Sequence, residues 1–165
     1  MKHVHDQRGK AKILSKMGSA YSFKGENEKA LTTYEECRGI QEATLGKSHP
    51  SYATTLNNIG GVYRKMGRHE EALTIYEECR VIFEATLGKS HPEYATTLGN
   101  IGGIYRKMGR YEEALKIYEE CRMIQEATLG NSHPSSLITL ENMKFIYESM
   151  GKTEEAKKIK EQLSY

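Results

Sequence analysis

The sequence is poor in the features that usually indicate a specific chemistry. Its 165 residues include no tryptophan, three prolines and three cysteines, and 24 lysines and arginines balance 22 aspartates and glutamates. Without a polybasic run, the chain offers no obvious surface for nucleic acid. Its apolar runs are only a few residues long, which excludes a transmembrane segment and a signal-peptide core. We therefore expect a cytoplasmic protein with neither a nucleic-acid nor a membrane partner.

The three cysteines are too regularly placed to form disulfides with one another. Cys37, Cys79 and Cys121 are evenly spaced and occupy one equivalent position in three successive segments. Packed helices lie roughly 8–10 Å apart, and a disulfide needs Cα atoms within about 7 Å. We expect buried free thiols in a reducing compartment. The same separation excludes a shared metal site.

A 42-residue repeat dominates the chain. Residues 49–90 return as residues 91–132 with eight differences, and less regular copies occupy residues 7–48 and 133–165. Residues 1–6 precede the periodic part, and we expect them to form a frayed leader before the first helix. A fixed period indicates one domain, residues 1–165, in which each unit packs only on its neighbours.

Within each repeat the pattern predicts two helices. His49-Pro50 begins the first, because proline suits the first helical turn, and apolar residues follow at spacings of three and four. Gly67 ends that helix, and Glu70 and Glu71 begin the second. The eight predicted helices are residues 8–24, 27–45, 50–66, 69–87, 92–108, 111–129, 134–150 and 153–163. Short loops make sequential helices antiparallel neighbours, and stacking the pairs gives an all-α fold.

The core positions resemble the tetratricopeptide repeat signature. The matching residues are Leu56, Ile59-Gly60, Tyr63, Ala72 and Tyr76, with Leu98, Ile101-Gly102, Tyr105, Ala114 and Tyr118 in the next unit. Glu84 and Glu126 stand where the helix-ending proline of that signature would be, so the second helix is longer and the repeat is of a long variety. This variety resembles the repeats of kinesin light chains. The resemblance implies a right-handed α-solenoid of four helix pairs that binds proteins along a concave surface lined by the first helices.

No residue pattern predicts an enzyme, a metal site or a cofactor site. His49, His91 and His133 recur one repeat apart, so they cannot share a metal, and we expect them to cap the helices they precede. The Gly60-Gly61 pair lies within a helix, away from the free helix N-terminus that a phosphate-binding loop needs. Close packing of the second helix explains Gly60, but it does not explain Gly61.

The candidate ligand site consists of first-helix residues that are not needed for the core. They are Thr54, Asn57, Asn58, Gly61, Arg64, Lys65, Thr96, Asn100, Gly103, Arg106, Lys107 and Asn142. By the resemblance, these residues face the ligand. Asn58, Asn100 and Asn142 form a series with one member per repeat. An asparagine amide offers a donor and an acceptor, so such a row can pair with the backbone of an extended peptide.

Charge is divided between the two kinds of helix. The first helices are basic and the second helices are mostly acidic, which predicts an acidic extended peptide as the ligand. The alternative is a structural spacer or a self-assembling repeat. The first repeat lacks a leading His-Pro and a polar cap, so it can stack end to end with another copy. The last helix is polar, as a terminal cap requires, and we expect Tyr165 to lie close to the natural C-terminus.

Overall fold

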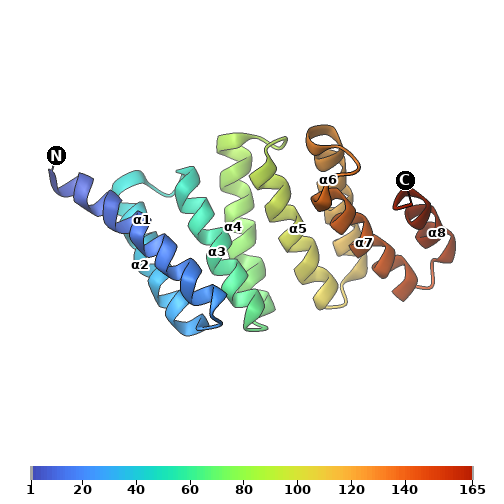
Figure 1. The fold of residues 1–165 in the computed structure, drawn as a ribbon, viewed down its shortest axis with the longest axis horizontal. Coiled ribbons are helices and arrows are strands. Elements are labelled where there is room, and N and C mark those ends of the chain that lie inside the picture. The colour runs from blue at the N-terminus through green and yellow to red at the C-terminus, as the bar shows by residue number, and fades with distance from the viewer. Residues whose placement is uncertain (1, 165) are drawn as a thin grey trace. The chain divides into compact units, whose positions relative to one another are not determined.

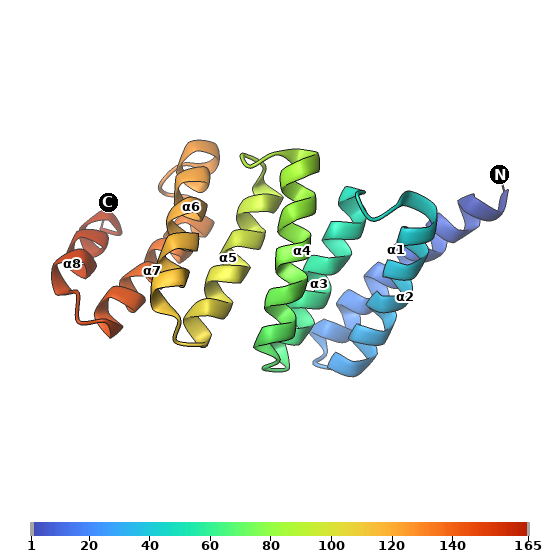
Figure 2. The same ribbon diagram turned by 180° about the vertical axis from the view of Figure 1, so that it is seen from behind.

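A computed structural model describes residues 2–164 of the chain, with side chains from residue 6 onwards, and the described part is entirely helical. The helices are α1 (Lys2–Phe23), α2 (Asn27–Leu45), α3 (Pro50–Lys65), α4 (His69–Leu87), α5 (Pro92–Lys107), α6 (Tyr111–Leu129), α7 (Pro134–Ser149) and α8 (Thr153–Gln162). Consecutive helices run antiparallel within each pair (Figures 1 and 2). The predicted all-α class with eight paired helices is confirmed.

The predicted helix boundaries agree with the structure to within one residue, except at the start of α1. That helix begins at Lys2, so the interpretation of residues 1–6 as a leader outside the helical part is wrong for residues 2–6. No proline or glycine interrupts this stretch, and the helix therefore extends through it. Tyr165 lies outside the described residues.

Histidine caps explain why three of the first helices begin where they do. The Nδ1 atoms of His49, His91 and His133 accept hydrogen bonds from backbone N–H groups two residues further along, at 3.1, 3.2 and 3.2 Å. Each cap precedes a proline at the first helical position. An imidazole nitrogen here satisfies one of the unpaired N–H groups of the first turn, and the predicted capping role is confirmed.

The helices form two compact units, residues 1–87 and residues 88–165. In the first unit α1 packs on α2, α2 on α3 and α3 on α4, and α1 also touches α3. In the second unit α5 packs on α6, α6 on α7 and α7 on α8, and α5 also touches α7. The first helices α3 and α7 are therefore each held between two second helices, while first helices within a unit also meet directly.

Each unit has a core in which a second helix packs on the first helix that follows it. In the first unit Ala30 and Tyr34 of α2 pack on Ile59 and Val62 of α3. In the second unit the equivalent cluster comprises Ala114, Tyr118, Met143 and Ile146. Burial of these side chains stabilises the packing of one helix pair on the next within each unit.

A glycine and a tyrosine form a matched pair inside each of the first three repeats. A Cβ atom added at Gly60 would lie 2.8 Å from the Tyr76 ring, which is closer than real Cβ contacts. The same holds for Gly18 with Tyr34 at 2.7 Å and for Gly102 with Tyr118 at 2.9 Å. In the last repeat Lys144 and Lys160 replace both members together. The predicted packing reason for Gly60 is confirmed.

The three cysteines are buried and free, as predicted. The Sγ atoms of Cys37, Cys79 and Cys121 donate to the backbone oxygens of Ala11, Ala53 and Ala95, each at 3.2 Å. Burial raises the pKa of the Cys121 thiol to about 11, which disfavours the reactive thiolate. These cysteines therefore act as packing residues.

Candidate functional site

The predicted residues on α3 share one helix face in the first unit. Thr54, Arg64 and Lys65 are exposed, whereas Asn57, Asn58 and Gly61 are partly buried. A Cβ atom added at Gly61 would meet only the Tyr76 hydroxyl, at an ordinary 3.7 Å. Packing therefore does not demand glycine at this position, in agreement with the expectation from sequence.

Two bases at the end of α3 have different roles. The Lys65 ammonium donates to the backbone oxygen and to the hydroxyl of Ser22, at 2.9 and 2.8 Å, and so ties α3 to the end of α1. Arg64 has no ion pair among the described residues. Burial raises the pKa of the Tyr76 phenol to about 12, and the nearby Arg64 cation partly opposes this shift. Arg64 is therefore the base that stays available beside the tyrosine.

The predicted residues of the second unit lie on α5 and α7. Thr96 and Lys107 are exposed, whereas Asn100, Gly103, Arg106 and Asn142 are partly buried. The Arg106 guanidinium lies over the Phe145 ring of α7, 5.0 Å from its centroid. This contact uses the face of a half-exposed aromatic ring and fixes the arginine in place.

A groove in the first unit provides a site that sequence reasoning defined only in part. It encloses about 710 Å³ between α1, the end of α2 and the start of α3. Its lining residues are Arg8, Gly9, Ala11, Lys12, Ser15, Lys16, Gln41, Thr44, Leu45, His49, Ser51, Thr54 and Thr55. Of the predicted site residues, only Thr54 lines it. We call it the α1–α3 groove.

The α1–α3 groove is basic, and no acidic side chain lines it. Arg8, Lys12 and Lys16 contribute three cations. Of the three, only Arg8 has a polar contact within the described part of the chain, a long hydrogen bond of 3.4 Å from its Nη2 atom to the Thr44 backbone oxygen. Cations of one sign in a concave surface reinforce each other's potential, so the groove attracts anionic groups.

Alignment of the repeats could have identified two of these bases from the sequence. Lys12 precedes Thr54 by one full repeat, and Lys16 precedes Asn58 by the same distance in sequence. They therefore occupy, on α1, the positions that the predicted site assigned on α3. The sequence predicted basic first helices, but the predicted site included neither residue, and Lys16 interrupts the asparagine series.

An unpaired acceptor lies among the residues that line the groove. Gln41 is 7% exposed, and its Oε1 atom has no hydrogen-bond partner among the described residues. In the second unit the equivalent Gln125 accepts a hydrogen bond of 2.8 Å from Thr139. A buried amide oxygen without a donor is costly, and an N–H group of a bound ligand would satisfy it.

The described part of the chain contains neither a metal-binding cluster nor a membrane-spanning helix. It has no cluster of three or more histidines, cysteines, aspartates or glutamates arranged to hold a metal ion. No helix within residues 2–164 is both long and apolar enough to cross a membrane.

Paired helices stacked through small and aromatic residues define a helical-repeat scaffold. A family model described as tetratricopeptide repeat matches residues 9–85, 53–122 and 93–163. The chain belongs to the tetratricopeptide repeat family, whose members generally bind proteins and peptides. A search of curated proteins returned no match to the chain.

Solved structures place the chain among kinesin light chain-like repeats. BtubC (BKLC) from P. vanneervenii is 21% identical over 93% of this chain, with a TM-score of 0.86, and this chain spans 61% of its length. A Podosopora anserina protein described as a kinesin light chain with nearly identical TPR-like repeats is 27% identical over the same share, with a TM-score of 0.76, and 73% of it is covered. The predicted resemblance is confirmed.

One structural neighbour is an enzyme by name. Aspartyl phosphate phosphatase F from Bacillus subtilis is 17% identical over 95% of this chain, with a TM-score of 0.84, and this chain spans 40% of its length. At this identity the likeness concerns the fold alone, because one fold supports many functions.

Proposed function

We propose that the chain is a non-enzymatic interaction scaffold whose first-helix faces bind an extended acidic peptide. The observation that carries the proposal is the α1–α3 groove. Arg8, Lys12 and Lys16 line this groove, and no acidic side chain does. Carboxylates of the peptide would lie against these cations, which favours both attraction and register. The predicted residues of α5 and α7 would present a second such face in the other unit.

Polar groups beside the bases suit a peptide backbone. Gln41 has an unpaired buried acceptor for a peptide N–H group. The Asn58 and Asn142 side chains have no hydrogen bond among the described residues, so their amides can pair with peptide N–H and C=O groups. Backbone pairing gives affinity for an extended segment, and the cations give preference for an acidic one.

A fluorescein-labelled peptide of aspartate, glutamate and serine tests the proposal by fluorescence anisotropy. Lys12→Gln with Lys16→Gln should weaken binding on the order of tenfold and reduce its salt dependence, because two charge contacts are lost. Asn58→Ala with Asn100→Ala should also weaken binding without unfolding the protein.

Two controls make the result interpretable. Lys158→Gln removes an exposed cation of α8, outside the groove, and should leave affinity unchanged. The matching peptide of asparagine, glutamine and serine should bind weakly to every variant. Equal affinity of the wild type and the Lys12/Lys16 variant for the acidic peptide would contradict the proposal.

A second candidate function, self-association, is favoured by an exposed apolar face of α1. Ile13 is 61% exposed and Met17 is 42% exposed, whereas their equivalents Thr55 and Ile59 are 1% and 0% exposed. This face of α1 therefore lacks the covering that the same face of α3 has. A second copy of the chain would supply it.

The charge of α8 favours one geometry of self-association. Lys157 and Lys160 stand where α2 has Leu31 and Tyr34, so α8 does not offer the apolar surface that α1 needs. Two α1 faces would therefore meet each other around a two-fold axis. If so, sedimentation velocity should show a sedimentation coefficient that rises with concentration, and Ile13→Glu with Met17→Glu should abolish the rise. A wild-type monomer at every concentration rules this function out.

A further inference from the structure

The last repeat lacks a buried tyrosine that the two central repeats contain. Tyr52 on α3 and Tyr94 on α5 are 2% and 0% exposed. Ser136 occupies the equivalent position on α7, one repeat after Tyr94. The last repeat therefore lacks the ring, although it keeps both helices of the pair.

The charged groups around the two tyrosines indicate the surroundings of a ring in this position. The side-chain charges that act on the Tyr52 phenol belong to Arg38, Glu42, Lys47 and Glu78. Within the second unit, the Tyr94 hydroxyl donates to the Glu120 carboxylate at 2.9 Å. The charge of an arginine thus acts on the Tyr52 phenol, and the Tyr94 hydroxyl reaches an acidic residue of the second helix of its own repeat.

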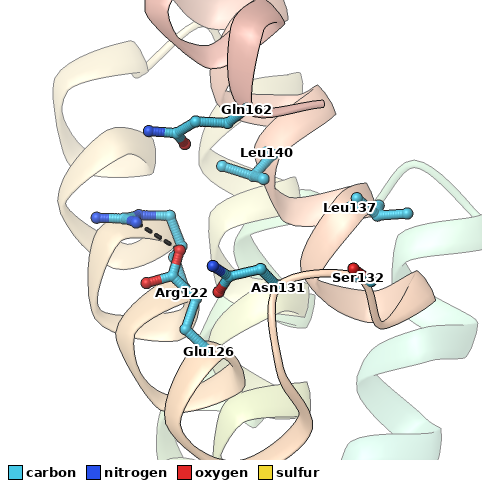
Figure 3. A pocket seen from close by; sticks show the side chains of 7 residues that line it. All are labelled: Arg122, Glu126, Asn131, Ser132, Leu137, Leu140 and Gln162. Atoms are coloured by element: carbon cyan, nitrogen blue, oxygen red, sulfur yellow. Dashed lines mark hydrogen bonds and ion pairs between the residues drawn. The ribbon is translucent and has the colours of Figure 1, made fainter. Parts of the chain in front are cut away.

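The second unit has a cavity at the equivalent place, which we call the α6–α8 cavity. It encloses about 530 Å³, and its lining residues are Arg122, Glu126, Asn131, Ser132, Leu137, Leu140 and Gln162 (Figure 3). Four of these, Arg122, Glu126, Asn131 and Gln162, are the repeat equivalents of Arg38, Glu42, Lys47 and Glu78. The cavity therefore shares four lining positions with the charged groups around Tyr52, whereas Ser136 itself is buried and does not line it.

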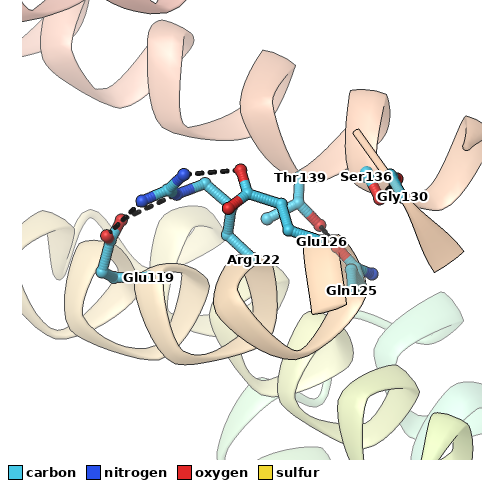
Figure 4. Close-up of polar contacts among 7 residues, drawn as sticks. All are labelled: Glu119, Arg122, Gln125, Glu126, Gly130, Ser136 and Thr139. Carbon is cyan, nitrogen blue, oxygen red and sulfur yellow. Dashed lines mark hydrogen bonds and ion pairs between the residues drawn. The ribbon is translucent and has the colours of Figure 1, made fainter. Parts of the chain in front are cut away.

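The arginine in the wall of the α6–α8 cavity is already paired with two carboxylates. Arg122 donates to Glu119 and to Glu126, each at 2.6 Å (Figure 4). These carboxylates raise the pKa of Arg122, and the guanidinium charge is used in the two salt bridges. The guanidinium is thus held as a flat polar wall, which does not favour a free anion as the ligand.

Among the remaining polar groups, Gln162 supplies an acceptor for a hydroxyl. Ser136 donates to the backbone oxygen of Gly130 at 2.9 Å, so its own hydrogen is used. The Gln162 side chain has no hydrogen bond among the described residues, and it stands where Glu120 accepts the hydroxyl of Tyr94 in the preceding repeat. Leu137 and Leu140 supply apolar surface. Apolar surface for a ring, a planar cation and one carbonyl acceptor together match a phenol.

We propose that the α6–α8 cavity binds a phenol ring in place of the tyrosine that the repeat lacks, with the hydroxyl donating to Gln162. The volume is sufficient, because an apolar cavity of roughly 150 Å³ already holds benzene. The phenol can come from a tyrosine side chain of a partner protein or from a small molecule. None of the residues proposed for the acidic peptide lines this cavity, so the two sites are independent.

Titration with p-cresol and with toluene, followed by two-dimensional NMR of the ¹⁵N-labelled chain, tests the proposal. p-Cresol should shift the signals of residues around the cavity, including Asn131 and Leu140, in a saturable way. Toluene, which lacks the hydroxyl, should bind at least threefold more weakly. Absence of saturable p-cresol shifts at these residues would refute the site.

Three variants separate this site from unspecific binding. Ser136→Tyr refills the cavity with the tyrosine of the other repeats and should weaken p-cresol binding at least tenfold. Ile138→Tyr adds the same side chain at an exposed position of α7 and should change nothing. Gln162→Leu should make p-cresol and toluene bind equally well, and this comparison remains valid if Ser136→Tyr fails to fold. Unchanged affinity in a folded Ser136→Tyr variant, or an unchanged p-cresol preference in Gln162→Leu, contradicts the proposal.

N-acetyl-tyrosinamide distinguishes the two sources of the phenol. Binding as tight as that of p-cresol supports a tyrosine side chain, because the cavity then admits the attached backbone. Binding of p-cresol alone supports a small phenol as the natural ligand.

Discussion

Replacing Tyr76 by alanine should lower the free energy of unfolding by about 3–5 kcal/mol and should also reverse the effect of a second substitution, Gly60→Ala. The cost of the first change follows from the burial of Tyr76, which is 1% exposed. Against the wild-type tyrosine, Gly60→Ala places a methyl group 2.8 Å from the ring and should cost about 1–3 kcal/mol through overpacking.

Without the tyrosine ring, the same alanine should stabilise the protein. The clash disappears, and alanine is favoured over glycine in a helix interior by about 1 kcal/mol. Urea denaturation followed by circular dichroism of the two single variants and the double variant gives the coupling between the two positions. Gly61→Ala is the matched control, because its Cβ atom would meet only the Tyr76 hydroxyl, and it should stabilise the protein in both backgrounds. Additive effects at Gly60 and Tyr76 would show that the close approach does not govern this packing.

The fold could be predicted from the sequence because the helix ends are determined locally. Proline after His49 and glycine at position 67 place the ends of α3 without reference to any distant residue, and Gly67 has a φ of 74° that favours glycine. Within one repeat, the apolar face of each helix has only one other helix to pack on. The short loops therefore determine which helices pair. The prediction for residues 2–6 was wrong because the repeat pattern fades there, whereas helix formation needs no repeat.

The candidate site was less predictable because its contacts join helices distant in sequence. Lys65 binds Ser22 on α1, and Arg106 stacks on Phe145 on α7, and neither pairing is visible in a helical pattern. The α1–α3 groove was recognised only in part, since the sequence pattern emphasised the residues that recur. Lys12 and Lys16 line the groove but differ from their repeat equivalents, so the recurring pattern did not include them.

Divergence from the repeat is therefore the sequence signal on which both proposed sites rest. The faithful positions maintain the stack, as Gly60 with Tyr76 and the histidine caps demonstrate. Lysine replaces threonine and asparagine on α1, and serine replaces tyrosine on α7. Lys12 and Lys16 line the α1–α3 groove, and the α6–α8 cavity lies in the repeat that carries Ser136.

Exchanging the residues at positions 52 and 136 should move the phenol site from the second unit to the first. Tyr52→Ser removes a ring that is 2% exposed and should cost about 3–5 kcal/mol of unfolding free energy, because a cavity remains among Arg38, Glu42 and Glu78. In the Ser136→Tyr background the original cavity is filled. p-Cresol should then raise the urea midpoint of the exchanged variant, since a ligand that binds only the folded state stabilises it.

The position of the bound phenol distinguishes a transferred site from general stabilisation. Signals around Glu78 should respond to p-cresol in the exchanged variant, and those around Leu140 should not. Tyr63→Ser is the control, because it makes the same exchange on the same helix at a position that is only partly buried. If p-cresol stabilises the Tyr63 variant as much as the exchanged variant, the cavity does not select the ring. A response confined to the exchanged variant would show that the absence of one tyrosine from this repeat is sufficient to create a binding site.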